Sequence, residues 1–443
     1  MREKTQQLKE FIVVLVLCLS ASGCVEEAAG PRPDPGPLVV EDPPRAVYGA
    51  EATPRASLDA QDGEPSPPLP QEGGDSGDPG LIYAAALGGY YILRIQLPDG
   101  NFGYRYDAEA GTWADDDSLA RQCGSTYTLS YLYEVTGREE FRVAAQWSHA
   151  RIAQRMDRPL SLGSPVALWA LGLTLHARAT GRSDWGDGFD VDTEIDRLGA
   201  ELLAIQREDG GFEREGFHAG SQFIQALWSV YTHTGDPRYL DALERGARYF
   251  YDTGLHERDL LFALWNNEPM AGLYALRPAP WILDLVWMVT DPVVEAQILP
   301  HHDVPALWVG GFILYGQPTP GALSMYGVEA SIDAFRLARM VGDVERAERY
   351  RAAALLGVRF LKSLQLREGD TDSFPEPDLT IGGVPYGFDR PILRVDITRH
   401  IVNSFIKVVT YLDLEDYPAR DRFLPRSTPS GGVLEAPFGP APP

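Results

Sequence analysis

Residues 234–239 (TGDPRY) join two stretches of helical periodicity, and versions of this segment recur along the chain. Earlier copies lie at residues 136–141 (TGREEF) and 180–185 (TGRSDW), and a later copy lies at residues 341–345 (VGDVE). A degenerate copy without the glycine is expected at residues 290–292 (TDP). In each complete copy the glycine supplies the left-handed residue that ends one helix, and a polar residue or proline begins the next. The complete copies are separated by about 50 residues, or by about twice that distance where the degenerate copy lies between them. This spacing predicts a series of helical hairpins.

A second repeat indicates how these hairpins are arranged. Residues 96–102 (QLPDGNF) and 206–212 (QREDGGF) share the pattern Q-x-x-x-G-x-F, and residues 365–369 with Phe374 form a looser copy. The pattern resembles the turns of the α/α-toroid superfamily, which includes terpene cyclases, protein prenyltransferases, some pectate lyases and glucuronyl C5-epimerases. The resemblance implies an all-α toroid of five or six repeated helical hairpins over residues 81–416. The alternative is an open solenoid of the tetratricopeptide type, but its repeat of about 34 residues does not fit the spacing.

The composition excludes several classes of protein. The chain has 443 residues with 39 Lys and Arg against 63 Asp and Glu, a net charge of −24. Nucleic-acid binding needs clustered cationic side chains, so no nucleic-acid partner is expected. A disulfide framework is also excluded, because Cys18, Cys24 and Cys123 are the only cysteines.

The N-terminus has the pattern of an export signal. A basic start is followed by the apolar residues 11–19 (FIVVLVLCL), which are too few to span a bilayer comfortably, and then by small residues that lead to Cys24. Residues 1–23 resemble a bacterial lipoprotein signal peptide, with Ala21 as a departure from the usual leucine. The resemblance implies lipidation of Cys24, with palmitate-type acyl chains anchoring the protein to the membrane. Because Val25 is not aspartate, it also implies the outer membrane. The alternative is an ordinary secretory signal cut nearby.

The regions that flank the predicted toroid are rich in proline. Residues 24–80 combine many prolines with acidic residues and little apolar content, so they are predicted to form a disordered tether. Residues 417–443 form a similar proline-rich C-terminal tail. The folded part is thus predicted to be a single toroid domain between two extended segments.

The loop after the first Q-x-x-x-G-x-F segment carries candidate site residues. The aromatic candidates for substrate binding are Tyr104, Tyr106 and Trp113, and an acidic run that includes Asp116 and Asp117 precedes Arg121. One interpretation is that the acidic run caps the following helix and complements its dipole. The other is that Asp116 or Asp117 acts as an acid, base or ligand beside Arg121.

Several chemistries of the toroid superfamily lack their motifs here. The acidic run lacks the fourth aspartate of the DxDD acid motif, and no DDxxD motif is present, which disfavours terpenoid cyclisation. Cys123 has no D-x-C partner for a prenyltransferase zinc site, so it is predicted to be a small buried residue of an inner helix. The adjacent His301 and His302 point in different directions on most backbones. The sequence therefore predicts neither a metal nor a cofactor.

Tyr326 and Glu329 lie one turn apart on a predicted inner helix. Glu329 falls among small and apolar residues, where a carboxylate needs a partner. One interpretation is a structural ion pair of Glu329 with Arg336 or Arg339. The other is that Glu329 has a raised pKa and is suited to acid/base catalysis.

The last predicted helix carries a polar stripe. Asp396, His400 and Asn403 are spaced i, i+4 and i+7, so they share one face. The segment resembles the end of the helical domain of glucuronyl C5-epimerases, which implies catalytic roles for Asp396 and His400. Arg394 and Arg399 are candidates for pairing with a substrate carboxylate. The alternative is a polar network that seals the ring.

Two functions remain open from the sequence. The first is an enzyme acting on a glycan by epimerase, lyase or hydrolase chemistry, for which the 9 Trp and 20 Tyr residues offer stacking surfaces. The second is a non-catalytic lipoprotein whose ring binds a glycan, a lipid or a protein partner. In both, the partners are the membrane, through a lipid anchor, and a glycan substrate or ligand.

Overall fold

The computed structural model describes residues 80–156, 163–181, 189–213, 219–254, 261–388 and 391–412, all within one compact unit. The predicted signal peptide, Cys24, nearly the whole tether and the C-terminal tail lie outside these residues. In the part of the chain that is described, no helix is long and apolar enough to cross a membrane.

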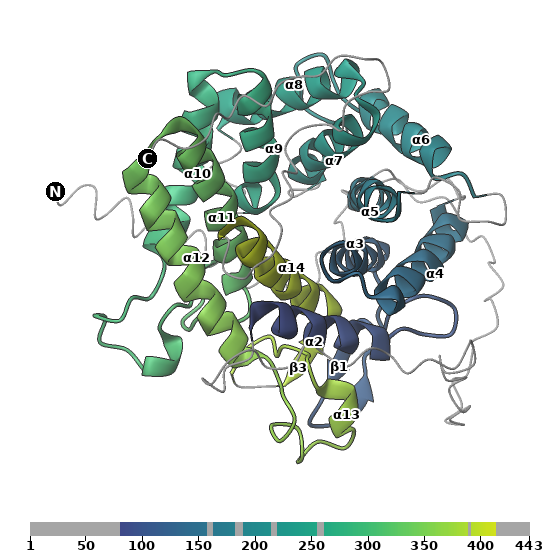
Figure 1. Ribbon diagram of the computed structural model, residues 1–443, viewed down its shortest axis with the longest axis vertical. Helices are drawn as coiled ribbons and strands as arrows, with labels where there is room; N and C mark the ends of the chain where they lie inside the picture. The colour runs from purple at the N-terminus through teal and green to yellow at the C-terminus, as the bar shows by residue number, and fades with distance from the viewer. Residues whose placement is uncertain are drawn as a thin grey trace, which may run out of the picture. The chain divides into compact units, whose positions relative to one another are not determined.

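Twelve long helices form two concentric layers in the described residues (Figure 1). The inner layer consists of α3 (Leu119–Thr136), α5 (Ser164–Thr180), α7 (Ala219–Thr234), α9 (Phe262–Leu276), α11 (Ser324–Val341) and α14 (Val395–Leu412). The outer layer consists of α2 (Leu81–Arg94), α4 (Glu139–Met156), α6 (Val191–Ala204), α8 (Pro237–Thr253), α10 (Pro280–Glu295) and α12 (Val344–Leu364).

The inner layer closes on itself. Each inner helix contacts the next in chain order, and the last of them, α14, also contacts the first, α3. Outside this ring, α2 packs against α14, so the first and last helices of the described fold form one hairpin-like pair. The structure confirms the predicted α/α toroid and shows that it has six hairpins.

The predicted Thr-Gly turns connect inner to outer helices. Gly137 and Gly342 end α3 and α11 with φ angles of 67° and 74°. No other atom lies within 4 Å of where a Cβ would stand at either position, so backbone conformation and not space requires glycine.

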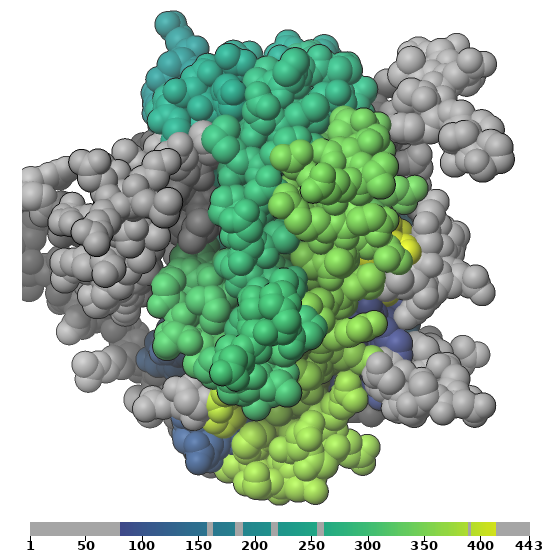
Figure 2. Space-filling model, turned by 90° about the vertical axis from the view of Figure 1, so that its left-hand side faces the viewer, coloured from purple at the N-terminus to yellow at the C-terminus, as the bar shows by residue number. Residues whose placement is uncertain are grey.

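The predicted fourth turn at residues 290–292 is wrong. Thr290 and Pro292 lie inside α10, and the chain turns earlier, at residues 277–279, before Pro280 begins the helix. Pro292 lies near the C-terminal end of α10, where it removes one hydrogen bond of the ladder, and the helix still continues to Glu295. Asp291 instead accepts hydrogen bonds from Arg349 and from the Tyr350 hydroxyl at 2.5 Å. This contact joins α10 to α12, and the two green segments lie side by side in Figure 2.

The Q-x-x-x-G-x-F glutamines link neighbouring outer helices. Gln96 Nε2 donates to the Ala144 carbonyl of α4 at 3.0 Å, and Gln206 Nε2 donates to the Ala242 carbonyl of α8 at 2.8 Å. Each also donates to the glycine carbonyl of its own turn, and a β-bridge joins each glutamine to the phenylalanine of its motif.

The structure shows two further turns of this kind. Gln297 bridges to Phe312 and donates to the carbonyls of Gly310 and Ala353, a copy hidden in the sequence by a longer loop. Gln365 donates to the carbonyl of Gly382 at 3.2 Å, which corrects the expected partner region at residues 369–374. It also donates to the Ala84 carbonyl of α2 at 2.9 Å, which joins the last outer helix to the first.

A small sheet interrupts the helical architecture. Strands β1 (Arg105–Asp107), β2 (Thr112–Trp113) and β3 (Ile392–Arg394) are antiparallel in the order β2-β1-β3, with Arg105 opposite Arg394. A short helix, α13 (Pro377–Thr380), and a 3₁₀ turn, η3 (Ala306–Trp308), lie in other loops. The sheet brings the loop before α3 next to the start of α14.

We expect Gln365→Ala to lower the free energy of unfolding by about 1–3 kcal/mol, because the buried carbonyls of Ala84 and Gly382 lose their donor. Denaturant titration of the variant against the parent protein measures the change. Gln154→Ala is the control, because Gln154 is an exposed residue of α4. Equal losses in the two variants would contradict a role for Gln365 in closing the ring.

Candidate functional site

The inner helices all begin at the same end of the ring, because each is followed by an antiparallel outer helix. This end carries the Gln turns and the sheet, and we call it the loop end. Arg121, Tyr326 and Asp396 lie in the first turns of α3, α11 and α14, and therefore all belong to the loop end. Three of the candidate residues thus come together from segments far apart in the sequence.

Glu329 and His400 form a buried pair between α11 and α14. Glu329 Oε1 lies 2.9 Å from His400 Nδ1, and each residue is only 4% exposed. The imidazole also meets two aromatic rings edge-on, Trp265 of α9 at 5.4 Å and Tyr326 at 5.7 Å between ring centroids. Side chains from two other inner helices, α9 and α11, therefore contact the imidazole.

Burial gives this pair unusual protonation behaviour. Desolvation raises the pKa of Glu329 to about 7, although the charges of Lys407 and Arg399 oppose the rise. Desolvation also lowers the pKa of His400 well below its usual value, and the positive charge of Arg399 adds to the effect. At neutral pH the histidine is neutral, and Glu329 is close to its midpoint. His400 Nε2 makes no hydrogen bond with any described residue, so it is available to a ligand.

A charged cluster extends from this pair along the ring. Lys407 Nζ lies 2.6 Å from Asp333 Oδ2, 3.5 Å from Glu268 Oε2 and 3.9 Å from Glu329 Oε2. Sequence reasoning missed Lys407, Asp333 and Glu268. The signal was present for Lys407, because it continues the stripe of Asp396, His400 and Asn403 at i+11. The expected partners Arg336 and Arg339 are not those found at Glu329.

Asp396 is held between two arginines. Arg121 Nε donates to Asp396 Oδ2 at 3.1 Å, and Arg394 donates to the same carboxylate at 2.6 and 3.0 Å. Burial opposes ionisation of Asp396, but the hydrogen bond and charge of Arg394, with the charges of Arg121 and Arg399, keep its pKa below the usual value. The Tyr104 ring packs against both guanidinium groups, and its centroid lies 4.7 Å from Arg121 Cζ and 5.5 Å from Arg394 Cζ.

Arg399 lies behind these groups in the interior. It is 5% exposed and packs on Gly124, where an added Cβ would stand 2.5 Å from its guanidinium carbon. Its Nε is buried without a hydrogen-bond partner among the described residues. Burial of the guanidinium lowers the pKa of Arg399, whereas the negative charges of Asp396 and Glu329 raise it.

The acidic run of the first loop is engaged elsewhere. Asp116 pairs with Arg105 at 3.2 Å, and Asp117 pairs with Arg155 of the outer helix α4 at 2.8 Å. Neither caps α3, whose N-cap residue Ser118 also makes no capping bond. The structure shows no contact between Asp116 or Asp117 and the Glu329–His400 pair.

The two remaining aromatic candidates lie on the sheet. Tyr106 has no exposed surface, so its ring belongs to the core, where no ligand reaches it in this conformation. Trp113 packs against Tyr106 at 4.8 Å but stays 42% exposed. Asn403 accepts a hydrogen bond from Thr128 at 3.0 Å, which ties α14 to α3 as expected of a residue that seals the ring.

Among the described residues, no group of three or more His, Cys, Asp and Glu side chains has the geometry of a metal site. His301 and His302 are exposed and pack edge to face at 4.6 Å between ring centroids. Cys123 is a free, fully buried residue of α3, as predicted.

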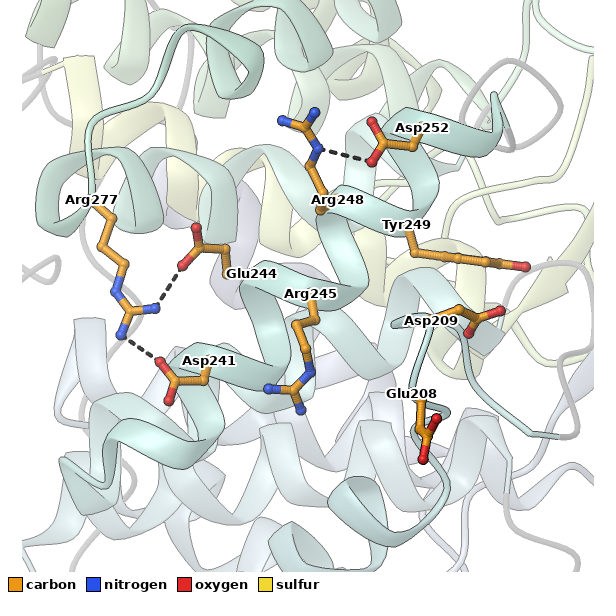
Figure 3. A pocket seen from close by; sticks show the side chains of 9 residues that line it. All are labelled: Glu208, Asp209, Asp241, Glu244, Arg245, Arg248, Tyr249, Asp252 and Arg277. Atoms are coloured by element: carbon orange, nitrogen blue, oxygen red, sulfur yellow. Dashed lines mark hydrogen bonds and ion pairs between the residues drawn. The ribbon is translucent and has the colours of Figure 1, made fainter.

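A polar pocket of 480 Å³ lies on the outer layer at α8 (Figure 3). Its charged side chains pair mainly with one another, as in Arg277 with Asp241 and Glu244, and Arg248 with Asp252. No buried acid/base pair borders it, so the chemical interest of the molecule lies at the loop end.

Comparisons with known proteins identify the fold. No protein-family model and no curated protein matches the sequence. Solved structures match it over most of both chains. An unsaturated glucuronyl hydrolase specific for heparin has a TM-score of 0.56 at 10% identity, covering 75% of this chain and 98% of that chain. An α-1,6-mannanase of Salegentibacter sp. has 0.54 at 12%, covering 74% and 98%. A D-mannose isomerase has 0.53 at 14%, covering 74% and 97%. At these identities the likeness shows a shared α/α-toroid fold.

We expect the stability of Glu329→Gln, relative to the parent protein, to improve as pH rises. A carboxyl with a raised pKa stabilises the fold in its protonated form. That contribution is complete below the unfolded-state value and is lost as pH rises through about 7. Glutamine stays neutral and escapes this loss. Calorimetric melting at about pH 5 and about pH 8 tests the expectation. Glu345→Gln, an exposed position on α12, should show no such pH dependence.

Proposed function

We propose that this protein is an enzyme that acts on a carbohydrate by acid/base proton transfer, with Glu329 and His400 at the reacting centre. The observation that carries the proposal is their 2.9 Å hydrogen bond between two inner helices, buried beside Trp265 and Tyr326. Burying an acid and a base together costs folding free energy, and ionisable groups with such perturbed pKa values cluster at functional sites.

The geometry assigns a role to each residue. Glu329 orients the imidazole through Nδ1, which leaves His400 Nε2 to take or return a proton at the sugar. When His400 becomes an imidazolium, the ionised form of Glu329 stabilises it, and Lys407 at 3.9 Å favours that ionised form. Asp396 remains a fixed carboxylate at the loop end, so the two carboxyl groups have pKa values shifted in opposite directions.

The names of the structural neighbours support a carbohydrate substrate. A glucuronyl hydrolase, a mannanase and a mannose isomerase all act on sugars, by their names. One mannanase structure is an inactive variant with two consecutive aspartates replaced. In this chain Asp116 and Asp117 are exposed and paired with arginines, whereas Glu329 and His400 are buried in direct contact, which favours Glu329 and His400 as the reacting centre.

The proposal leaves epimerisation, elimination and hydrolysis to be distinguished by their products. A histidine base held by a carboxyl suits removal of a proton from a sugar carbon or hydroxyl. The second candidate function is non-catalytic binding of a glycan, a lipid or a protein by the ring. The exposed Trp113 and the half-buried Tyr104 at the loop end suit the binding of a sugar face.

We expect Glu329→Gln and His400→Asn each to reduce turnover by about 100-fold or more, the usual contribution of a general acid or base. A panel of neutral and acidic oligosaccharides, with products resolved by NMR, identifies the responsive substrate and the reaction class. Glu345→Gln, on the outer helix α12, is the matched control and keeps full activity. If wild-type protein binds a sugar but never converts it, or if Glu329→Gln turns over normally, the catalytic proposal is wrong and the binding function replaces it.

We also propose that the protein is exported and anchored to the outer membrane by acyl chains on Cys24. The support is the sequence pattern alone: a basic start, an apolar segment and small residues that lead to this cysteine.

We expect metabolic labelling with a palmitate analogue to mark the wild-type protein and not Cys24→Ser. Cys123→Ser, which changes a fully buried thiol, should keep the label. A mature N-terminus at any residue other than Cys24 would contradict lipidation and leave an ordinary secreted protein.

A further inference from the structure

The arginines around Asp396 carry a local surplus of positive charge inside an acidic protein. Arg121, Arg394 and Arg399 surround a single ionised carboxylate, Asp396, and the nearby Glu329 has a pKa of about 7. Arg105 is neutralised separately by Asp116. Three arginines thus lie around one ionised carboxylate, although the whole chain has a net charge of −24.

The helix dipoles add to this surplus. All six inner helices point their N-termini to the loop end, and an N-terminus carries about half a positive charge. Clustered anions would be the usual complement, but α3, α11 and α14 have only one acidic residue among their first turns, which is Asp396.

Hydrogen-bond donors remain free in this positive region. Arg121 contacts Asp396 through Nε alone, so its two terminal nitrogens make no hydrogen bond with a described residue, and its side chain is 37% exposed. Arg399 Nε is buried with no described partner. Arg394, in contrast, commits two nitrogens to Asp396. Arg399 packs on Gly124, one helical turn after Arg121 on α3, so both guanidinium groups belong to the same region of the loop end.

We infer that Arg121 and Arg399 bind an oxyanion, a carboxylate or a sulfate, that is carried by the sugar substrate. This inference rests on the proposed function and names the substrate class of the same site. Planar guanidinium groups suit such an anion because two parallel N–H bonds match its two oxygens. Tyr104 packs against Arg121 and Arg394 and supplies an aromatic face for the sugar ring.

An acidic sugar and its neutral ester should differ in their affinity for this site. An acidic sugar gains the charge-assisted hydrogen bonds of both arginines, whereas its neutral ester leaves those donors unsatisfied. Asp396 reduces the non-selective binding of anions by the arginines, because it already accepts hydrogen bonds from one nitrogen of Arg121 and two of Arg394.

The test compares trisaccharides of glucuronate, galacturonate and mannuronate with their own methyl esters by isothermal titration calorimetry on the full-length protein. We expect at least one acid to bind about 10-fold or more tightly than its ester, and Arg121→Gln to remove that difference. Sulfated neutral trisaccharides and inorganic sulfate, tested in parallel, show whether sulfate replaces carboxylate and whether the sugar is required.

Two controls keep the result interpretable. Arg248→Gln removes a partly exposed arginine on the outer helix α8, paired with Asp252, and should leave all affinities unchanged (Figure 3). Arg399→Gln, at a buried site, is used only if its melting temperature matches that of the parent protein, and should weaken acid binding as Arg121→Gln does.

The outcomes separate this inference from the proposed function. If esters bind as tightly as acids, if no acidic or sulfated sugar binds, or if Arg121→Gln leaves the preference intact, the oxyanion site is wrong, even where Glu329→Gln still abolishes turnover of a neutral sugar. If acids are preferred but never converted, the oxyanion site stands and the catalytic proposal fails.

Discussion

Four glutamine side chains keep the outer helices of this toroid in contact. Each amide nitrogen donates to a glycine carbonyl of its own turn and to an alanine carbonyl of the next outer helix. Gln365 is the decisive member, because its bond to Ala84 spans the whole chain and joins the end of the ring to its beginning. Without closure, α14 would have no α2 to cover its outer face, and the site at its start would lose its support.

Closure determines the electrostatics of the interior. Once the ring of six inner helices encloses the polar stripe of α14, the charged groups of the stripe are removed from water and need partners on neighbouring elements. Asp396 contacts arginines, which lower its pKa and keep it ionised. Glu329 contacts a neutral histidine, and burial raises its pKa to about 7. Asp396 of α14 and Glu329 of α11 are thereby two carboxyl groups of opposite behaviour on neighbouring inner helices, an arrangement that suits acid/base chemistry.

The charge distribution connects the fold to the proposed substrate class. Parallel inner helices bring their N-termini to one end, and the arginines add to that positive field. Two acidic residues of the first loop are engaged elsewhere, Asp116 with Arg105 and Asp117 with Arg155. The arginines at Asp396 are therefore the local cationic feature on which the proposed binding of an acidic sugar rests.

The repeated Thr-Gly turns were enough to predict helical hairpins, because each is a local backbone event that a few adjacent residues determine. The closed ring followed from the resemblance of the Gln turns to those of the α/α-toroid superfamily. The same logic failed at residues 290–292, where a turn-like triplet lies inside α10, and at Gln297, whose partner glycine follows a longer loop. Sequence periodicity also placed Asp396 and His400 on one face of the last helix.

Only the tertiary structure decided what those residues contact. It placed Glu329 of α11 against His400, added Lys407 to the cluster, enclosed Tyr106 in the core and turned Asp117 toward α4. The physical reason is that spacing along a helix determines which side chains share a face. The partner on a facing helix depends on how the helices pack, and closure of the ring adds the contact of Arg121 with Asp396, 275 positions further along the chain.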